Sequence, residues 1–139
     1  MHERWLERQR RVLLVEDDAW IRTFLRDVLL DASYGVLEAA DGRTGLRIAE
    51  QEHPDLLVLD LAMPEFTGLD VLNELSRSAQ ARDIPVLVLS AYVNLLALRE
   101  ASAVTAVLPK PVDVSELLGA IERALEQGCA RRAASRVRA

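Results

Sequence analysis

The stretch Val58-Leu59-Asp60-Leu61-Ala62-Met63-Pro64 indicates the fold, because in it a short apolar run ends abruptly in one carboxylate. Residues 56–59 are all apolar, and polar or proline-containing segments bound them on both sides. Such a run, with no solvent-facing side, predicts a strand buried on both faces. Asp60 is therefore expected at the carboxyl end of a strand. In parallel α/β sheets ligands bind beyond those ends, so Asp60 is a candidate site residue.

The same pattern, an apolar run followed by polar side chains, recurs along the chain. The runs are residues 12–15 before Glu16-Asp17-Asp18, residues 86–89 before Ser90, and residues 106–108 before Pro109-Lys110-Pro111. A weaker run at residues 36–39 has no polar residue directly after it, which is consistent with a strand at the edge of the sheet. Segments with apolar residues at helical spacing separate these runs. The alternation predicts five βα units, with a parallel sheet covered by helices on both faces.

Two of the predicted helices have distinctive sequences. The last one is expected to begin at Asp113-Val114-Ser115-Glu116, which has the form of a capping box, and to end at Gly128. Residues 92–103 are predicted to be helical but are more apolar than one buried stripe requires. Within this segment, the apolar stretch from Tyr92 to Leu98 is compatible with ordinary core or with an exposed protein-docking face, and its excess of apolar side chains favours the docking face.

The length and composition allow one domain with an aliphatic core. The chain has 139 residues, half of them hydrophobic and only 4% aromatic. Its single cysteine, Cys129, has no partner for an intramolecular disulfide. No apolar stretch is long enough to span a bilayer, and the charged amino terminus lacks the pattern of a signal peptide. We therefore expect a cytoplasmic protein without membrane contact.

The charge is distributed unevenly along the chain. Residues 12–127 carry 20 of the 22 acidic residues but only 9 of the 17 basic ones. Such an acidic body repels nucleic acid and attracts cations, so we expect no direct contact with nucleic acid. Sixteen of the basic residues are Arg, and the only lysine is Lys110, between two prolines after the last predicted strand. A compact ammonium at this one place indicates a specific role.

The side chains that follow four of the strands predict phosphoryl chemistry. Because the carboxyl ends of parallel strands meet at one edge, we expect Glu16, Asp17, Asp60, Ser90 and Lys110 to lie together. Clustered carboxylates suit Mg²⁺, and a carboxylate can itself become an aspartyl-phosphate. Phosphoryl transfer depends on positioning and on neutralising negative charge. A divalent cation, an ammonium and a hydroxyl supply that neutralisation, so the residues favour Asp60 as a phosphoryl acceptor.

The motifs together resemble the receiver domain of bacterial two-component response regulators. They are Val15-Glu16-Asp17-Asp18, Asp60-Leu61-Ala62-Met63-Pro64 with Gly68, Ser90-Ala91, and Lys110-Pro111. The resemblance covers about residues 11–127, which leaves residues 1–10 as an N-terminal extension and residues 128–139 as a basic C-terminal tail or the start of a linker. It implies a three-layer α/β/α, flavodoxin-like fold whose five-stranded parallel sheet has the order 2-1-3-4-5.

The resemblance also implies a role for each acidic residue of the site. Asp60 would accept a phosphoryl group from a histidine kinase or a phosphotransfer protein. Asp17 and Asp60 would bind Mg²⁺ directly, with Glu16 acting through a water molecule and the backbone carbonyl of Ala62 as a further ligand. Mn²⁺ could substitute for Mg²⁺.

Ser90 and Lys110 would contact the phosphoryl oxygens. The resemblance implies phosphorelay signalling that switches protein–protein contacts, with a downstream protein or a homodimer using the face formed by residues 91–107. The domain would at most phosphorylate and dephosphorylate itself, so no enzyme that turns over a separate substrate is expected.

The chain departs from the family pattern near the proposed output surface. Receivers often carry an aromatic residue three positions before the lysine, coupled to the Ser or Thr, but Val107 stands there. Val112 replaces the Phe that often follows Lys-Pro. The segment between Ser90 and Lys110 is also about two residues shorter than usual. These departures concern the choice of partner or dimer geometry and not the chemistry at Asp60.

Three other functions compete with this interpretation. One is a receiver-like interaction module that is not phosphorylated, which the complete set of acceptor residues disfavours. A Mg²⁺-dependent phosphohydrolase of the haloacid dehalogenase type would need a second acid two residues after its nucleophile, where this chain has Ala62. A flavodoxin-like cofactor binder would need a phosphate-cradling loop rich in Gly, Ser and Thr after the first strand, where this chain is acidic.

Overall fold

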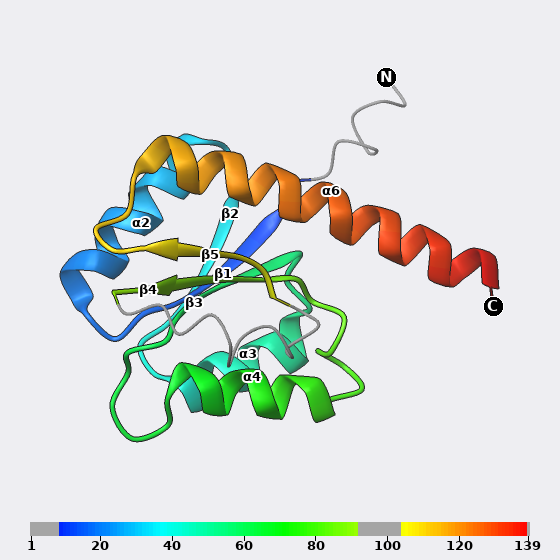
Figure 1. Ribbon diagram of the computed structural model, residues 1–139, viewed down its shortest axis with the longest axis horizontal. Coiled ribbons are helices and arrows are strands. Elements are labelled where there is room, and N and C mark those ends of the chain that lie inside the picture. Colours follow the sequence, from blue (N-terminus) through cyan, green and yellow to red (C-terminus); the bar gives the residue numbers. More distant parts are fainter. Residues whose placement is uncertain (1–8, 92–103, 139) are drawn as a thin grey trace.

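The computed structural model describes residues 9–91 and 104–138, and for residues 129–138 the backbone alone. Its elements are β1 (Arg11–Val15), α2 (Ala19–Asp31), β2 (Gly35–Ala39), α3 (Gly42–Glu52), β3 (Leu56–Asp60), α4 (Gly68–Arg77), β4 (Val86–Ser90), β5 (Val104–Pro109) and α6 (Val114–Arg138). Strands alternate with helices through most of this order (Figure 1). The helix predicted at residues 92–103, and with it most of the proposed output face at residues 91–107, lies outside the described residues.

The five strands form one parallel sheet in the order β2-β1-β3-β4-β5. The expected order 2-1-3-4-5 is therefore confirmed. The chain winds outward in opposite directions from the neighbouring strands β1 and β3, and ligands of such sheets bind where the strand order reverses. Val15 of β1 pairs with Leu59 of β3, so Glu16 and Asp60 follow directly after paired positions.

Helices cover both faces of the sheet and give the expected three layers. Alternate residues of a strand point to opposite faces, so Leu13 and Val15 of β1 join a core cluster with α3 and α4. Val12 and Leu14 join a second cluster with α2 and α6. Figure 1 shows these helix pairs on opposite sides of the sheet. The central strands are buried on both faces, as their unbroken apolar runs predicted.

The last helix differs from the sequence prediction at its end. One of the two hydrogen bonds of the expected capping box is present, since Oδ1 of Asp113 accepts from the Glu116 N–H at 2.9 Å. The expected end at Gly128 is wrong, because α6 continues to Arg138. A glycine ends a helix by adopting a left-handed backbone, and none of the glycines in the described ranges has a positive φ. Gly128 is instead buried in the helix, and a Cβ there would lie 3.3 Å from Pro85 Cγ.

No helix among the described residues is both long enough and apolar enough to cross a membrane.

Candidate functional site

The candidate site lies at the carboxyl edge of the sheet, where the ends of β1 and β3 place two acids. Asp60 is the last residue of β3 and is 2% exposed. Glu16 follows β1, is fully buried, and donates its backbone N–H to Ala39 O at 3.1 Å. Asp17 comes next and is exposed to solvent. The strand ends therefore bring the three acids to one place, as the sequence predicted; the structure adds that two of them are buried and one is exposed.

These three acids are close enough to share one cation. One carboxylate oxygen from each of Glu16, Asp17 and Asp60 lies within 4.8 Å of the other two. Like charges at this separation repel each other unless a cation or a proton compensates them. A site made only of oxygen ligands, with carboxylates among them, suits a hard divalent cation such as Mg²⁺. The donor set of this chain therefore fits a Mg²⁺ ion.

Lys110 supplies a positive charge to the two buried acids. Its Nζ lies 3.1 Å from Asp60 Oδ1 and 3.2 Å from Glu16 Oε1. Burial alone would lower the pKa of Lys110, but the hydrogen bond and charge of Asp60, followed by those of Glu16, outweigh it and raise that pKa. The ammonium is thus held in its charged form between both carboxylates. The only lysine of the chain occupies the position that the strand pattern predicted.

The protonation of Glu16 reflects its crowded surroundings. Burial raises the pKa of Glu16 to about 7, and the hydrogen bond and negative charge of Asp60 act in the same direction. The Asp18 backbone and the charge of Lys110 oppose this rise, but with smaller effect. Without a metal, Glu16 therefore tends to hold a proton near neutral pH. A bound divalent cation would favour the ionised form.

The loop after β3, residues 61–67, turns its backbone toward Asp60. The Ala62 N–H donates to Asp60 Oδ1 at 3.0 Å. The two ends of the loop meet, because the Gly68 N–H donates to Leu61 O at 3.2 Å. A Cβ at Gly68 would lie 2.5 Å from Leu61 Cα and 2.8 Å from Asp60 O, so only glycine permits this approach. The backbone of Ala62 is therefore at the site, while metal binding by its carbonyl stays a prediction.

Ser90 ends β4 at the same edge and is 4% exposed. Its carbonyl accepts a hydrogen bond from the Lys110 N–H at 3.1 Å, which ties the ends of β4 and β5 together. Leu89, the residue before it, pairs with Asp60 in the sheet. The fold thus places Ser90 beside the strand ends that carry the acceptor candidate and the lysine. Its contact with a phosphoryl group stays a prediction.

Val107 and Val112, two of the departures from the family pattern, pack into the interior. Val107 of β5 is partly buried against the core cluster that α3 and α4 cover. Val112, after β5, packs against the opposite cluster with α2 and α6. Both side chains therefore act as small apolar packing groups where receivers often have aromatic rings.

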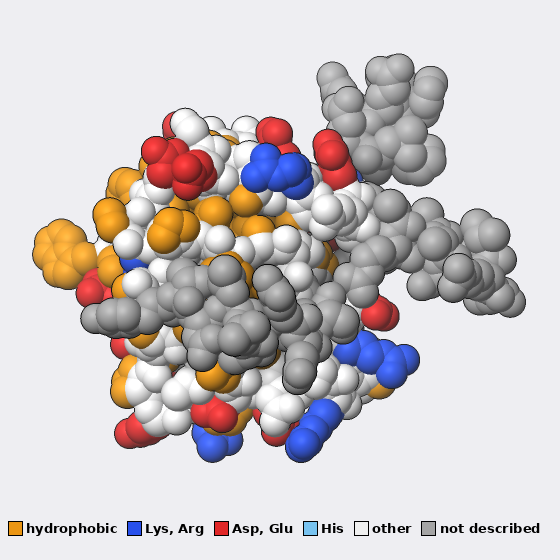
Figure 2. All heavy atoms as spheres, in the orientation of Figure 1, with side chains coloured by type: hydrophobic (Ala, Val, Ile, Leu, Met, Phe, Trp, Pro, Cys, Tyr) orange, Lys and Arg blue, Asp and Glu red, His pale blue; other side chains and the backbone are white. Residues whose placement is uncertain are grey.

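The structure also shows contacts near the acids that the strand pattern did not indicate. Arg22 of α2 donates from its guanidinium to Glu16 O at 2.7 Å, although helical periodicity gave it no role. Asp18 caps α2 by accepting from the backbone N–H groups of Trp20 and Ile21. Trp20 is 88% exposed, and hydrophobic side chains appear on the surface at the end of the molecule where α2 begins (Figure 2). Trp20 is therefore a solvent-exposed indole on the helix that starts beside the acids.

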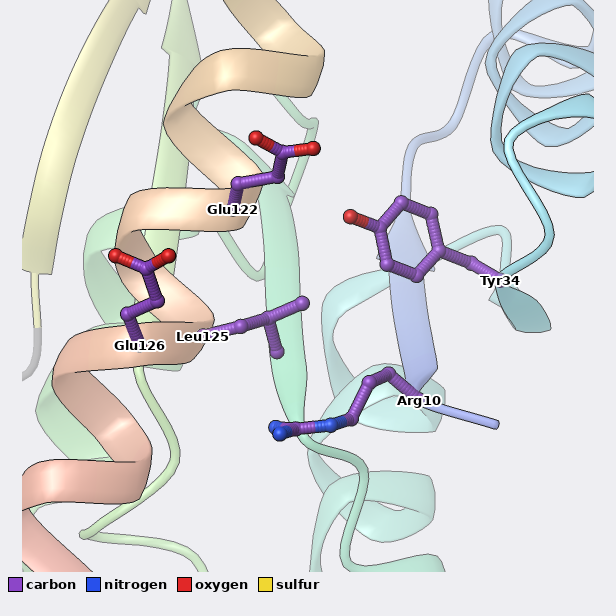
Figure 3. Close-up of a pocket in the computed structure, with 5 residues that line it drawn as sticks. All are labelled: Arg10, Tyr34, Glu122, Leu125 and Glu126. Atoms are coloured by element: carbon purple, nitrogen blue, oxygen red, sulfur yellow. The ribbon is translucent and has the colours of Figure 1, made fainter. Parts of the chain in front are cut away.

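A pocket lies at the opposite, amino-terminal edge of the sheet. It has a volume of about 600 Å³ and is lined by Arg10, Tyr34, Glu122, Leu125 and Glu126. Arg10 precedes β1 and Tyr34 precedes β2, while α6 supplies the other three side chains (Figure 3). This pocket contains none of the strand-end side chains that form the candidate site.

Comparison with known sequences shows the family of this chain. The model of the response regulator receiver domain family matches residues 12–122. The transcriptional regulatory protein PdtaR of Mycobacterium tuberculosis is 36% identical over 121 residues, which cover 85% of this chain and 58% of PdtaR. The chain therefore spans little more than half the length of this relative.

Solved structures agree with this match. The chemotaxis protein CheY4 of Vibrio cholerae gives a TM-score of 0.78 at 29% identity, over 84% of this chain and 98% of CheY4. The receiver domain of the sensor histidine kinase PA1611 of Pseudomonas aeruginosa gives a TM-score of 0.77 at 26% identity, over 85% of this chain and 98% of that domain. That structure contains a magnesium ion coordinated in the active site cleft. By its family match, its fold and its relatives, the chain belongs to the receiver domain family of two-component response regulators.

Proposed function

We propose that this receiver domain accepts a phosphoryl group on Asp60 from a histidine kinase or a phosphotransfer protein. One observation carries the proposal: a buried carboxylate receives the Lys110 ammonium at 3.1 Å and the Ala62 amide at 3.0 Å on the same oxygen. These two donors hold the Asp60 side chain in one orientation at the edge of the sheet. A fixed carboxylate beside a positive charge is suited to act as a nucleophile toward phosphorus.

The reaction exchanges one bond to phosphorus for another. An oxygen of Asp60 bonds to the phosphorus of a phosphohistidine as the N–P bond breaks, and the electron pair of that bond returns to the imidazole nitrogen. Lys110 then contacts a phosphoryl oxygen, because the negative charge has moved outward from the carboxylate. The hydroxyl of Ser90 donates to another phosphoryl oxygen. Water later removes the phosphoryl group from Asp60.

Mg²⁺ is part of the same proposal. Asp17 and Asp60 would hold the ion directly, Glu16 through a water molecule, and Ala62 through its backbone carbonyl. The bound ion would neutralise negative charge on the phosphoryl group, and Mn²⁺ could take its place. The proximity of the three carboxylates supports this assignment, as does the magnesium ion in the PA1611 receiver.

The output of the domain would be a change in protein contacts. Phosphorylation adds up to about two negative charges to a site that already contains three acids. We propose that this change acts through the face formed by residues 91–107, on a downstream protein or a second copy of the chain. The domain would work in the cytoplasm, without direct contact with nucleic acid or membrane.

Intact-mass measurement tests the proposal. The full chain is incubated with Mg²⁺ and a small-molecule phosphodonor, and separately with a phosphorylated kinase partner. We expect the wild type to gain one phosphoryl mass and Asp60→Asn to gain none. Asp55→Asn is the matched control, because Asp55 is also a buried acid next to β3 but lies at the opposite end of that strand. A wild type that gains no mass with either donor would support the unphosphorylated interaction module instead.

A further inference from the structure

The loop that follows Asp60 touches the start of α3 through one aromatic ring. The Arg43 guanidinium carbon lies 4.4 Å from the centroid of the Phe66 ring, within the range of a cation–π contact. Beside it, a Cβ at Gly42 would lie 2.8 Å from Phe66 Cδ1 and 2.9 Å from Phe66 O. The absence of a side chain at Gly42 therefore lets the loop approach the α3 backbone. The ring is partly buried against the core cluster under α3 and α4.

Contacts with the rest of the domain help to hold the loop, because one of its residues has an unfavourable backbone conformation. Glu65 has a φ of 63°, in the left-handed region that costs a residue with a side chain free energy. Glu65 and its neighbour Pro64 are both exposed, so they contribute little packing of their own. Met63, which is 4% exposed, and Phe66 are the side chains that attach this part of the loop to the core. Of these two, only Phe66 has a cationic partner among the described residues.

We propose that Arg43 and Phe66 are positioning residues for the acceptor site. Their stack fixes the far side of the loop, and the closed loop thereby keeps the Ala62 backbone against Asp60. This inference rests on the proposed function for its consequence, which is the geometry available to Mg²⁺ and the phosphoryl group. If Arg43 positions the loop, the unit of β2 and α3 also contributes to the site, although no polar side chain directly follows β2.

The direction in which Mg²⁺ affinity changes when Arg43 is removed distinguishes a positioning role from a simple effect of charge. Removal of a positive charge from this domain would by itself strengthen the binding of Mg²⁺ or leave it unchanged, since it can only reduce repulsion of the ion. A positioning role predicts the opposite, because the loop loses its anchor. Arg47→Ala is the matched control: Arg47 is an exposed arginine one turn further along α3, and no aromatic contact involves it in the described structure. Arg47→Ala therefore measures the effect of removing one positive charge while the contact between Arg43 and Phe66 stays intact.

The first measurement is amide exchange of Ala62 in the full chain, followed by NMR without metal or phosphodonor. We expect exchange to accelerate about threefold in Arg43→Ala, the loss typical of one exposed cation–π contact. In Phe66→Ala we expect about tenfold, because apolar contact is lost as well. Phe66→Tyr keeps the ring and should exchange as the wild type does. Arg47→Ala should also leave the rate unchanged.

The second measurement is calorimetric titration with Mg²⁺ alone. We expect the Kd to rise about threefold in Arg43→Ala and about tenfold in Phe66→Ala. The double variant should match Phe66→Ala alone, because the two residues act through one contact. Thermal unfolding shows whether each variant is folded. If Phe66→Ala is not, Phe66→Leu replaces it, since leucine keeps apolar bulk and removes the ring face.

Three results would overturn the proposal: equal effects of Arg43→Ala and Arg47→Ala, strict additivity in the double variant, or tighter Mg²⁺ binding by Arg43→Ala. Failure of the proposed function looks different. A wild type that is never phosphorylated removes the acceptor role of Asp60, whereas the exchange rate of Ala62 still decides whether Arg43 and Phe66 position the loop.

Discussion

At the carboxyl edge of the sheet, two acids are buried against one lysine, whereas at the amino edge two acids of α6 line an open pocket. Asp60 and Glu16 are at most 2% exposed and share the Lys110 ammonium. At the amino edge, Glu122 and Glu126 are exposed to solvent. Burying like charges together costs several kcal/mol per ion unless a counter-charge compensates them. Compared with the side chains of the amino-edge pocket, the buried acids and lysine of the carboxyl edge are therefore arranged so that the arrival of a cation or a phosphoryl group changes their electrostatics strongly.

Of the substitutions considered, Lys110→Met should have the largest effect on the function of the carboxyl edge. Without the ammonium, two buried carboxyl groups lose their counter-charge, and the phosphoryl group loses a positive partner during transfer. We expect the rate of Asp60 phosphorylation to fall at least about a hundredfold, as when one charge-stabilising group is removed from an active site. Time-resolved intact-mass measurement gives the rate. Arg10→Met, at the amino edge, should leave the rate unchanged, and a similar loss in both variants would contradict the contrast between the edges.

Gly68→Ala tests how closely the loop approaches the acceptor strand. The new Cβ would meet Leu61 Cα at 2.5 Å and Asp60 O at 2.8 Å, and neither backbone atom can move freely. We expect a loss of about 2 kcal/mol in the free energy of unfolding, within the usual range for overpacking. Denaturant titration measures it.

Gly119→Ala is the matched control for that substitution. A Cβ at Gly119, on α6, would meet only the flexible end of Arg123, at 3.3 Å. Alanine favours helix over glycine, so this variant should gain roughly 0.5–1 kcal/mol. Equal losses in both glycine variants would show that the tight approach beside Asp60 has no special cost.

Asp17→Asn should weaken Mg²⁺ binding at the carboxyl edge by about tenfold, since it removes the charge of one proposed ligand at small cost in volume. Trp20, which is 88% exposed on the adjoining helix, serves as the fluorescent probe once Trp5 is replaced by Phe. Glu126→Gln removes the same charge from the amino-edge pocket and should leave the titration unchanged. An unaltered Mg²⁺ response in Asp17→Asn would remove this residue from the metal site.

The fold and the main site were predictable because both follow from local sequence patterns and one rule of topology. Unbroken apolar runs identify buried strands, and the parallel arrangement brings Glu16, Asp60 and Lys110 to one edge. The family resemblance added the strand order, which spacing alone does not determine. These patterns depend only on residue type and position, so they can be recognised without knowledge of any side-chain contact.

Other features gave no local signal. The stack of Arg43 on Phe66 joins a helix start to a loop, and no periodicity relates two such positions. The guanidinium contact of Arg22 with the Glu16 carbonyl depends on how α2 packs beside β1. Gly128 gave a misleading signal, since glycine ends a helix only where the backbone turns left-handed, and α6 continues instead.

The smallest expected effect concerns Tyr34 in the amino-edge pocket. Burial raises the pKa of Tyr34 above its ordinary value of 10.0, with the charge of Glu122 adding to the rise and that of Arg10 opposing it. The folded protein therefore keeps the phenol proton at a pH where the unfolded chain has lost it. The stability from this group is complete below pH 10 and is lost as the pH rises through the raised pKa.

Two variants isolate this effect. Tyr34→Phe should remove this part of the pH dependence in denaturant titrations above pH 10, and Glu122→Gln should lower the phenol pKa measured by phenolate absorbance in a Tyr92→Phe background. Neither variant should change phosphorylation of Asp60, because none of the described side chains belongs both to the pocket and to the acceptor site. A change in the phosphorylation of Asp60 would show that the two edges are coupled through the sheet. The amino-edge pocket would then not be independent of the acceptor site.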